Sequence, residues 1–284
     1  MRKLIAFTLL LLMCQSAVCM DIFDAIKEGN IKEVQRLIAQ DPKVVNAHER
    51  KYKNTPLHYA ALCGKADIAT LLLCNNADVN SRAARNNTPL HHACLCDHIH
   101  VAQILIDYGA NVFGCKEEKS TPLHTASAKG YTRAVRFLLD HGAQIDACDS
   151  GNCTPLHDAA RLGYAHVSAI LLNCGANINA HNWQNKTPLE YAKQEGYIDV
   201  IQLFEDWPFY QQRINKNREA ILAFCMAQHP RCGAESPART LAMDLYKSVG
   251  KLVAIPEHTP NQIHQIAQQE RRLQQQNNSR CSIQ

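Results

Sequence analysis

Thr55-Pro56-Leu57-His58 is the stretch that decides the fold, because it returns along the chain at a constant interval. The same four residue types begin again at Thr88, Thr121 and Thr154, and Thr187-Pro188-Leu189-Glu190 closes the series with glutamate in the fourth place. Each copy begins 33 residues after the previous one. A fixed period of this length indicates a repeat protein, in which units too small to bury their own apolar residues stack on their neighbours.

Each unit is predicted to form two short helices joined by a turn. The hydroxyl of Thr55 can cap a helix, and Pro56 takes the first helical position, where no amide donor is needed. Gly64 predicts the end of this helix in the left-handed conformation. A second helix follows, with apolar residues at the spacing of one helical face: Ile68, Leu71 and Leu72.

The tetrapeptide and its period resemble those of the ankyrin-repeat family. The resemblance extends to the segments after the second helix, such as Asn76-Ala77-Asp78-Val79-Asn80 and Gly175-Ala176-Asn177-Ile178-Asn179. It implies an all-α fold: an α-solenoid of helix-turn-helix units with β-hairpin loops, followed here by a short helical C-terminal tail. It also implies that the histidine of each tetrapeptide is structural and ties the start of its helix to adjoining backbone.

The period predicts six repeats over 20–207, of which the outer two are atypical, as the ends of a solenoid require. Their bounds are 20–53 for the N-terminal cap, then 54–86, 87–119, 120–152 and 153–185, and 186–207 for the C-terminal cap. Beyond the array, apolar spacing predicts a helical tail over 208–255. The Gln-rich composition of 256–284 predicts a flexible segment.

The N-terminus has the pattern of a secretory signal. Arg2 and Lys3 precede an apolar run over 4–13, and Ala17-Val18-Cys19 places small residues at a cleavage site. A membrane-spanning helix is the alternative, but the run is far shorter than the ~20 residues that a span needs. We therefore expect a signal peptide over 1–19, cleavage near Cys19, and an exported protein that is periplasmic or secreted.

The charge balance argues against two classes of partner. The chain carries 30 basic and 26 acidic residues, a formal net charge of +4. This small excess gives no electrostatic basis for binding nucleic acid or an anionic membrane surface. We expect a protein partner, no nucleic acid, no membrane association after removal of the signal, and a monomeric chain.

No motif in the sequence points to catalysis. The chain contains no Gly-x-x-x-x-Gly-Lys, Gly-x-Ser-x-Gly or His-Glu-x-x-His motif. His91, Cys94, Cys96 and His98 lie close together like zinc ligands. When the repeats are aligned, however, Cys94 falls where the preceding repeat has an alanine that is expected to be buried. The four residues are also spread over two predicted helices and the turn between them. We expect a non-enzymatic protein without metal or cofactor.

The resemblance places partner binding on the hairpin tips and on the concave face made by the first helices. Trp183 is the strongest candidate, because an aromatic side chain at a loop tip can anchor a contact; packing against the neighbouring hairpin is the alternative. Tip charges of both signs favour a protein partner. The candidate residues are Tyr52, Arg82, Arg85, Glu117, Glu118, Arg161, His181 and Trp183.

The hairpin tips differ from the family pattern at one position. Ankyrin repeats often carry glycine where this chain has Lys53, Asn86, Lys119, Asn152 and Asn185. Asparagine tolerates the left-handed conformation, so three of these tips should be normal. The two lysines suggest altered tips.

Two cysteines flank one of the tips. Cys148 and Cys153 stand on either side of Asp149-Ser150-Gly151-Asn152 and could face each other across it. In an oxidising compartment they could form a disulfide. We therefore predict a disulfide here that depends on export.

These features favour one function and leave two alternatives. The leading hypothesis is an exported scaffold that binds a protein partner through its concave face and hairpin tips, with a host-interaction effector role. The first alternative is a periplasmic inhibitor or protective binding protein. The second is an adaptor that recruits host ubiquitin machinery through its tail, which shows a loose resemblance to F-box-like helices.

Overall fold

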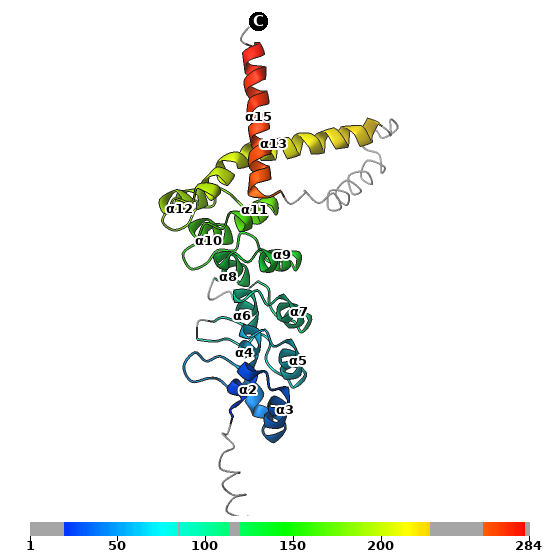
Figure 1. The fold of residues 1–284 in the computed structure, drawn as a ribbon, viewed down its shortest axis with the longest axis vertical. Coiled ribbons are helices and arrows are strands. Elements are labelled where there is room, and N and C mark those ends of the chain that lie inside the picture. The colour runs from blue at the N-terminus through cyan, green and yellow to red at the C-terminus, as the bar shows by residue number, and fades with distance from the viewer. Residues whose placement is uncertain (1–19, 85, 114–119, 228–257, 282–284) are drawn as a thin grey trace, which may run out of the picture. The chain divides into compact units, whose positions relative to one another are not determined.

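The computed structural model describes residues 20–84, 86–113, 120–227 and 258–281 (Figure 1). Within these ranges the regular structure is helical and contains no strand. The chain forms two compact units, one of Met1–Thr125 with His141–Ala143 and one of Ala126–Asp140 with Gln144–Gln284. The expected all-α solenoid architecture is confirmed. The loops between repeats are tight hydrogen-bonded turns in place of the expected β-hairpins.

Unit 1 contains three pairs of helices. The first helix of one pair contacts the first helix of the next, and the second helices do the same, so the pairs stack as the period predicts. The helices are α2 (Ile22–Glu28), α3 (Ile31–Gln40), a 3-10 helix η1 (Pro42–Asn46), α4 (Pro56–Leu62), α5 (Ala66–Cys74), α6 (Pro89–Leu95) and α7 (Ile99–Asp107).

Unit 2 continues the pattern and adds the tail. Helix α10 contacts α12, and α11 contacts both α9 and α13. The helices are α8 (Pro122–Lys129), which spans the boundary between the units, α9 (Thr132–Asp140), α10 (Pro155–Arg161), α11 (Ala165–Asn173), α12 (Pro188–Glu195), α13 (Ile198–Ala227) and α15 (Pro260–Cys281).

The leucine of each Thr-Pro-Leu-His tetrapeptide forms the centre of the core. Leu57, Leu90, Leu123 and Leu156 are completely buried. They are accompanied by small residues one turn later, which lets neighbouring first helices approach closely. The repeat pattern therefore supplies the core directly.

The turns between repeats have the predicted left-handed residue. Asn86, Asn152 and Asn185 have φ values of 52°, 58° and 57°, and Lys53 has a φ of 54°. Lys53 thus keeps the conformation that asparagine adopts in the other turns, although its side chain makes that conformation less favourable. Lys119 lies outside the described residues.

The tail differs from what composition predicts. A single helix, α13, runs from Ile198 to Ala227 with Pro208 inside it, so the chain has no break at 207. Residues 260–281, expected to be flexible, form α15, which packs against α13. Ile263 and Ala267 of α15 are completely buried. The expected helical tail over 208–255 is described only as far as 227.

Two buried carboxylates hold α13 and α15 together. Asp206 of α13 pairs with His264 of α15 at 2.5 Å and with Arg271 at 2.8 Å. Glu270 of α15 pairs with two cations of α13, as its carboxylate lies 2.8 Å from an Arg213 nitrogen and 3.0 Å from the Lys216 nitrogen. Both acidic side chains are 1% exposed. Each helix therefore supplies a buried acid to basic side chains of the other.

Candidate functional site

We call the turn that follows each repeat a finger and number it by that repeat. Four fingers are described below: finger 1 (48–54), finger 2 (81–87), finger 4 (147–153) and finger 5 (180–186). Each is closed by a backbone hydrogen bond across its base, of which the bond from Asp149 N to Cys153 O is an example. Successive fingers within a unit are also linked. Ala84 N donates to Tyr52 O at 2.7 Å, and Trp183 N donates to Gly151 O at 3.1 Å.

Finger 1 exposes three basic side chains and one aromatic ring. The Glu49 carboxylate accepts hydrogen bonds from Lys51 N (3.1 Å) and Tyr52 N (2.8 Å), which fixes the shape of the turn. Arg50, Lys51, Tyr52 and Lys53 are exposed, with Tyr52 at 52%. The Lys51 nitrogen lies 4.9 Å from the centroid of the Tyr52 ring.

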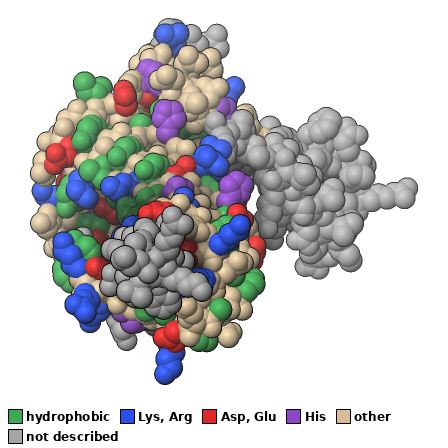
Figure 2. Space-filling view, turned by 60° about the horizontal axis from the view of Figure 1, so that its bottom comes forward, with side chains coloured by type: hydrophobic (Ala, Val, Ile, Leu, Met, Phe, Trp, Pro, Cys, Tyr) green, Lys and Arg blue, Asp and Glu red, His purple; other side chains and the backbone are tan. Residues whose placement is uncertain are grey.

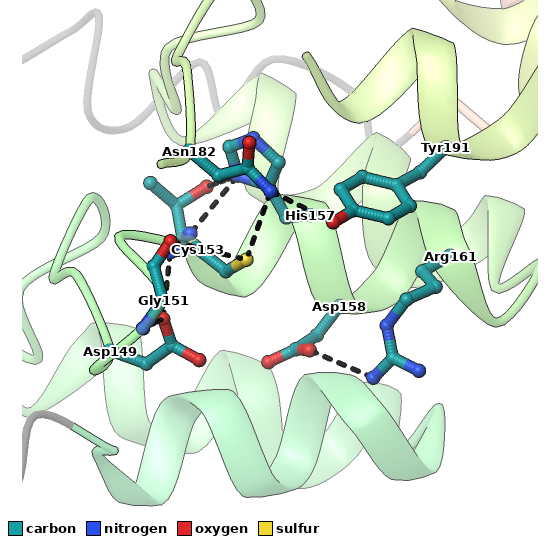
Figure 3. Close-up of polar contacts among 9 residues, drawn as sticks. Asp149, Gly151, Cys153, His157, Asp158, Arg161, Asn182 and Tyr191 are labelled. Carbon is teal, nitrogen blue, oxygen red and sulfur yellow. Dashed lines mark hydrogen bonds and ion pairs between the residues drawn. The ribbon is translucent and has the colours of Figure 1, made fainter. Parts of the chain in front are cut away.

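Fingers 4 and 5 share an internal acceptor at equivalent positions (Figure 3). Asp149 Oδ1 accepts from Gly151 N at 2.8 Å and from Cys153 N at 2.7 Å. Asn182 Oδ1 accepts from Gln184 N and Lys186 N, both at 2.9 Å. Because these side chains bond within their own turns, both fingers have a fixed backbone shape.

Finger 5 presents Trp183 to solvent. Its side chain is 72% exposed, the largest exposed fraction among the aromatic residues described. Its backbone amide bonds to the neighbouring finger, while most of the side chain stays open to solvent. A rigid backbone with an exposed indole is suited to contact another molecule.

The first helices of unit 2 add polar side chains beside the fingers. Asp158 and Arg161 of α10 form an ion pair at 3.2 Å (Figure 3). Lys186 donates to Gln194 Oε1 at 2.7 Å, and its nitrogen lies 5.5 Å from the centroid of the Tyr191 ring. In unit 1 the same helix positions carry less polar, half-buried side chains: Tyr59, Leu62, His92 and Leu95.

The tetrapeptide histidines are structural, as expected. Thr55 N donates to His58 Nδ1 at 3.1 Å, so the ring proton sits on Nε2 and is donated to the Asn87 carbonyl at 2.9 Å. His91 repeats this arrangement with Thr88 and Ser120. Burial lowers the pKa of both His58 and His91 to about 4, so both rings are neutral at physiological pH.

The cluster that resembled a zinc site does not converge. His91 caps its own helix, and the His98 ring packs over Gly64 in the preceding repeat. Cys94 is completely buried, which raises the pKa of its thiol to about 12. In the described part of the chain, no three His, Cys, Asp or Glu side chains gather into a group that could hold a metal ion.

A disulfide between Cys148 and Cys153 is not formed, and both residues are thiols. The exposed Cys148 thiol lies 3.6 Å from the Asp146 carbonyl oxygen, whereas Cys153 is half-buried and lies 3.7 Å from Asn182 Nδ2. The export-dependent disulfide therefore stays a prediction, and the Asp149 carboxylate closes the turn from inside. The closed turn leaves the two sulfur atoms with different neighbours.

Unit 2 also contains a polar cavity of about 390 Å³. Tyr164, His166, Asp199 and Gln202 line it, together with residues at the start of α15. The His264 ring at its edge is already bonded to Asp206. Of its polar groups, Gln202 of α13 and His264 of α15 are hydrogen-bonded to each other at 2.8 Å.

Five of the eight candidate contact residues lie on the described surface. Tyr52 and Arg82 are exposed in unit 1, and Arg161, His181 and Trp183 are exposed in unit 2. Arg85, Glu117 and Glu118 lie outside the described residues, as does the expected signal peptide over 1–19. Sequence reasoning missed Lys186 and Tyr191, although Tyr191 lies four repeats after Tyr59 and three repeats after His92, at the same helix position.

Side chains of different kinds are mixed on the surface. Figure 2 shows Lys and Arg side chains scattered among acidic and hydrophobic ones on the face it draws. None of the described helices is both long enough and apolar enough to cross a membrane.

A family model for ankyrin repeats in sets of three copies matches residues 22–83, 78–149, 112–182 and 145–218. The chain belongs to the ankyrin-repeat family. A similar relative is the transient receptor potential cation channel subfamily A member 1 homolog of Caenorhabditis elegans, 39% identical over 61 residues. That match covers 22% of this chain and 5% of the channel homolog, so the chain spans only a small part of this relative's length. Ankyrin repeats mediate protein–protein interaction, and the exposed fingers are consistent with that activity.

Proposed function

We propose that this ankyrin-repeat protein is an exported scaffold that binds a protein partner through its fingers and the adjoining first helices. The observation that carries the proposal is Trp183, a 72% exposed indole on a finger whose backbone is fixed by internal hydrogen bonds. A partner that covers this ring gains apolar burial, and the finger loses little conformational freedom because it is already ordered.

The surroundings of Trp183 support a protein as the partner. The ion pair of Asp158 and Arg161 and the bonded pair of Lys186 and Gln194 lie on the adjoining helices and loops. An apolar centre with polar neighbours of both signs is the composition of protein interfaces. The face therefore fits a polypeptide better than a uniformly charged ligand.

The test is partner capture with matched variants of the full chain. Trp183→Ala should lose the captured partner, and Leu273→Ala should retain it, because Leu273 is an exposed hydrophobic residue on α15 away from the fingers. Equal capture by the two variants would contradict the proposal.

Export and a host-interaction role rest on the N-terminal pattern of Arg2, Lys3, the apolar run over 4–13 and the site near Cys19. Cell fractionation and sequencing of the mature N-terminus test this part. Uncleaved protein in the cytoplasm would contradict export. Cleaved protein retained in the periplasm would favour the inhibitor or protective role over a host-interaction effector.

A further inference from the structure

The basic residues of the described fingers are concentrated in unit 1. Finger 1 carries Arg50, Lys51 and Lys53, and finger 2 carries Arg82, all exposed. We call the three basic residues of finger 1 the basic cluster. Finger 4 carries the acidic Asp149, and finger 5 carries one basic residue, Lys186, which is bonded to Gln194.

The single acidic residue of finger 1 leaves the tip with an excess of positive charge, because Glu49 stands against three basic residues. Glu49 directs both carboxylate oxygens to the amides of Lys51 and Tyr52 inside the turn. In the part of the chain that the structure describes, neither Arg50 nor Lys53 has an acidic side chain within ion-pair distance. The charge of finger 1 is therefore directed to solvent.

The cluster is also held in place. The bond from Ala84 N to Tyr52 O joins the tips of fingers 1 and 2 at 2.7 Å, so their cations are displayed on linked backbones. The Tyr52 ring is exposed among them. Cations ordered around an aromatic ring can pair with carboxylates at a lower entropic cost than cations on a mobile loop.

We propose that fingers 1 and 2 bind an acidic polypeptide segment, rich in Asp and Glu, which places an apolar or aromatic side chain against Tyr52. This inference rests on the proposed function and names the chemistry of the partner. The three cations of finger 1 supply complementary charge, and Tyr52 supplies the apolar contact.

The surroundings of the cluster favour a polypeptide over a phosphate backbone. The first helices beside the two fingers carry Tyr59, Leu62, His92 and Leu95. Lys27, which lies over the Tyr59 ring, is paired with Asp24, so the unpaired positive charge of finger 1 does not continue into a basic groove. A nucleic acid would need such a stripe of positive charge to follow its backbone. A peptide with alternating acidic and apolar residues matches both parts of the surface.

The experiment selects peptides from a random library on the immobilised full chain. The test variant carries Arg50→Gln, Lys51→Gln and Lys53→Asn, the last chosen because asparagine adopts the same backbone conformation in three other fingers. The control variant loses the same charge elsewhere through Lys32→Gln, Lys43→Gln and Lys193→Gln, all at exposed positions. Circular dichroism and thermal unfolding verify that both variants fold.

We expect the selected peptides to be enriched in Asp and Glu with interspersed apolar residues. Their affinity should fall about tenfold or more in the test variant, weaken as salt is raised, and stay within about twofold of the parent value in the control. Peptides without acidic enrichment, or with equal affinity for the test and control variants, would overturn the inference.

Two further probes cover the other anionic ligands. A single-stranded oligonucleotide or anionic phospholipid vesicles that bind more tightly than the peptides, and depend on the same three cations, would assign the cluster to phosphate instead. If selected peptides lack acidic residues but still require Trp183, the acidic inference fails while the proposed function stands. If no peptide depends on any finger residue, both fail.

Discussion

His58 Nε2 lies 2.9 Å from the carbonyl oxygen of Asn87, the residue that precedes the next Thr-Pro-Leu-His tetrapeptide. His157 makes the same contact to Lys186 at 3.1 Å. Each ring therefore caps its own helix with Nδ1 and joins the following repeat with Nε2. A protonated ring could not accept the threonine amide at Nδ1, so the contact requires the neutral form.

This arrangement predicts acid sensitivity. The pKa of His58 and His91 is about 4 in the folded chain against an ordinary value of 6.5, so between these values the unfolded chain binds more protons. Linkage then lowers the free energy of unfolding as the pH falls through this window, by up to about 1.4 kcal/mol per pH unit for each ring, and the loss stops below the folded pKa. Urea unfolding across the window measures the slope.

His58→Gln provides the control for acid sensitivity. Glutamine at this position can still cap the helix but does not titrate. The variant should therefore have a smaller pH slope than the parent, even though it is less stable at neutral pH. An unchanged slope would show that this ring does not contribute.

A second prediction concerns two glycines with the same backbone conformation. Gly163 and Gly196 both have a φ of 77°, but a Cβ on Gly163 would lie 2.6 Å from the Tyr197 ring, whereas a Cβ on Gly196 would meet nothing within 4 Å. Gly196→Ala should cost about 1 kcal/mol of unfolding free energy from the left-handed strain alone. Gly163→Ala should cost about 1–3 kcal/mol more, because the ring must move. Equal losses in denaturant unfolding would argue against the contact.

Lys53 provides a stabilising substitution. The backbone φ of 54° at Lys53 is unfavourable for any residue that has a Cβ. The backbone amide of Lys53 donates to the Glu49 carbonyl, and a glycine at this position would keep that hydrogen bond. Lys53→Gly should raise the free energy of unfolding by about 0.5–1 kcal/mol. Asn86→Gly is the comparison, and its effect should be smaller because asparagine tolerates this conformation. A destabilised Lys53→Gly variant in thermal unfolding would contradict the argument.

Adjacent acids on α13 test the attachment of α15. Asp206 is 1% exposed and contacts His264 and Arg271 of α15, whereas Glu205 is 53% exposed and pairs with Lys193. Asp206→Asn should lower the local stability of α15 by about 1–3 kcal/mol, because a buried charge-assisted contact is lost. Glu205→Gln should change it by less than about 0.5 kcal/mol. Hydrogen exchange of the α15 amides measures both, and equal protection in the two variants would remove the proposed role of Asp206.

The repeat architecture could be predicted from sequence because its interactions are local or recur one period later. Leu57, the capping pair of Thr55 and His58, and the left-handed turn at Gly64 each have partners within their own repeat or the next one. Five copies of the same pattern then specify the stack. The exposure of Trp183 could also be anticipated, because the repeat alignment places this residue in a turn between two repeats.

The tail and the details of the fingers could not be predicted in this way. Helix α15 has a Gln-rich sequence with few apolar residues, and it is placed by contacts with residues far away in the chain, such as Glu270 with Arg213. In finger 4 the Asp149 carboxylate points into its own turn, where it accepts from Gly151 N and Cys153 N. Nothing in the spacing of the residues encodes that direction.

The sequence by itself determined the number and phase of the repeats, the core leucines and the structural role of the histidines. Only the tertiary structure decided that α15 docks on α13 and that Glu49 turns inward while three cations of finger 1 face solvent. The physical reason is the range of the interactions. A periodic stack is built from neighbour contacts that every repeat encodes, whereas the docked helix and the finger charges depend on unique contacts and side-chain directions.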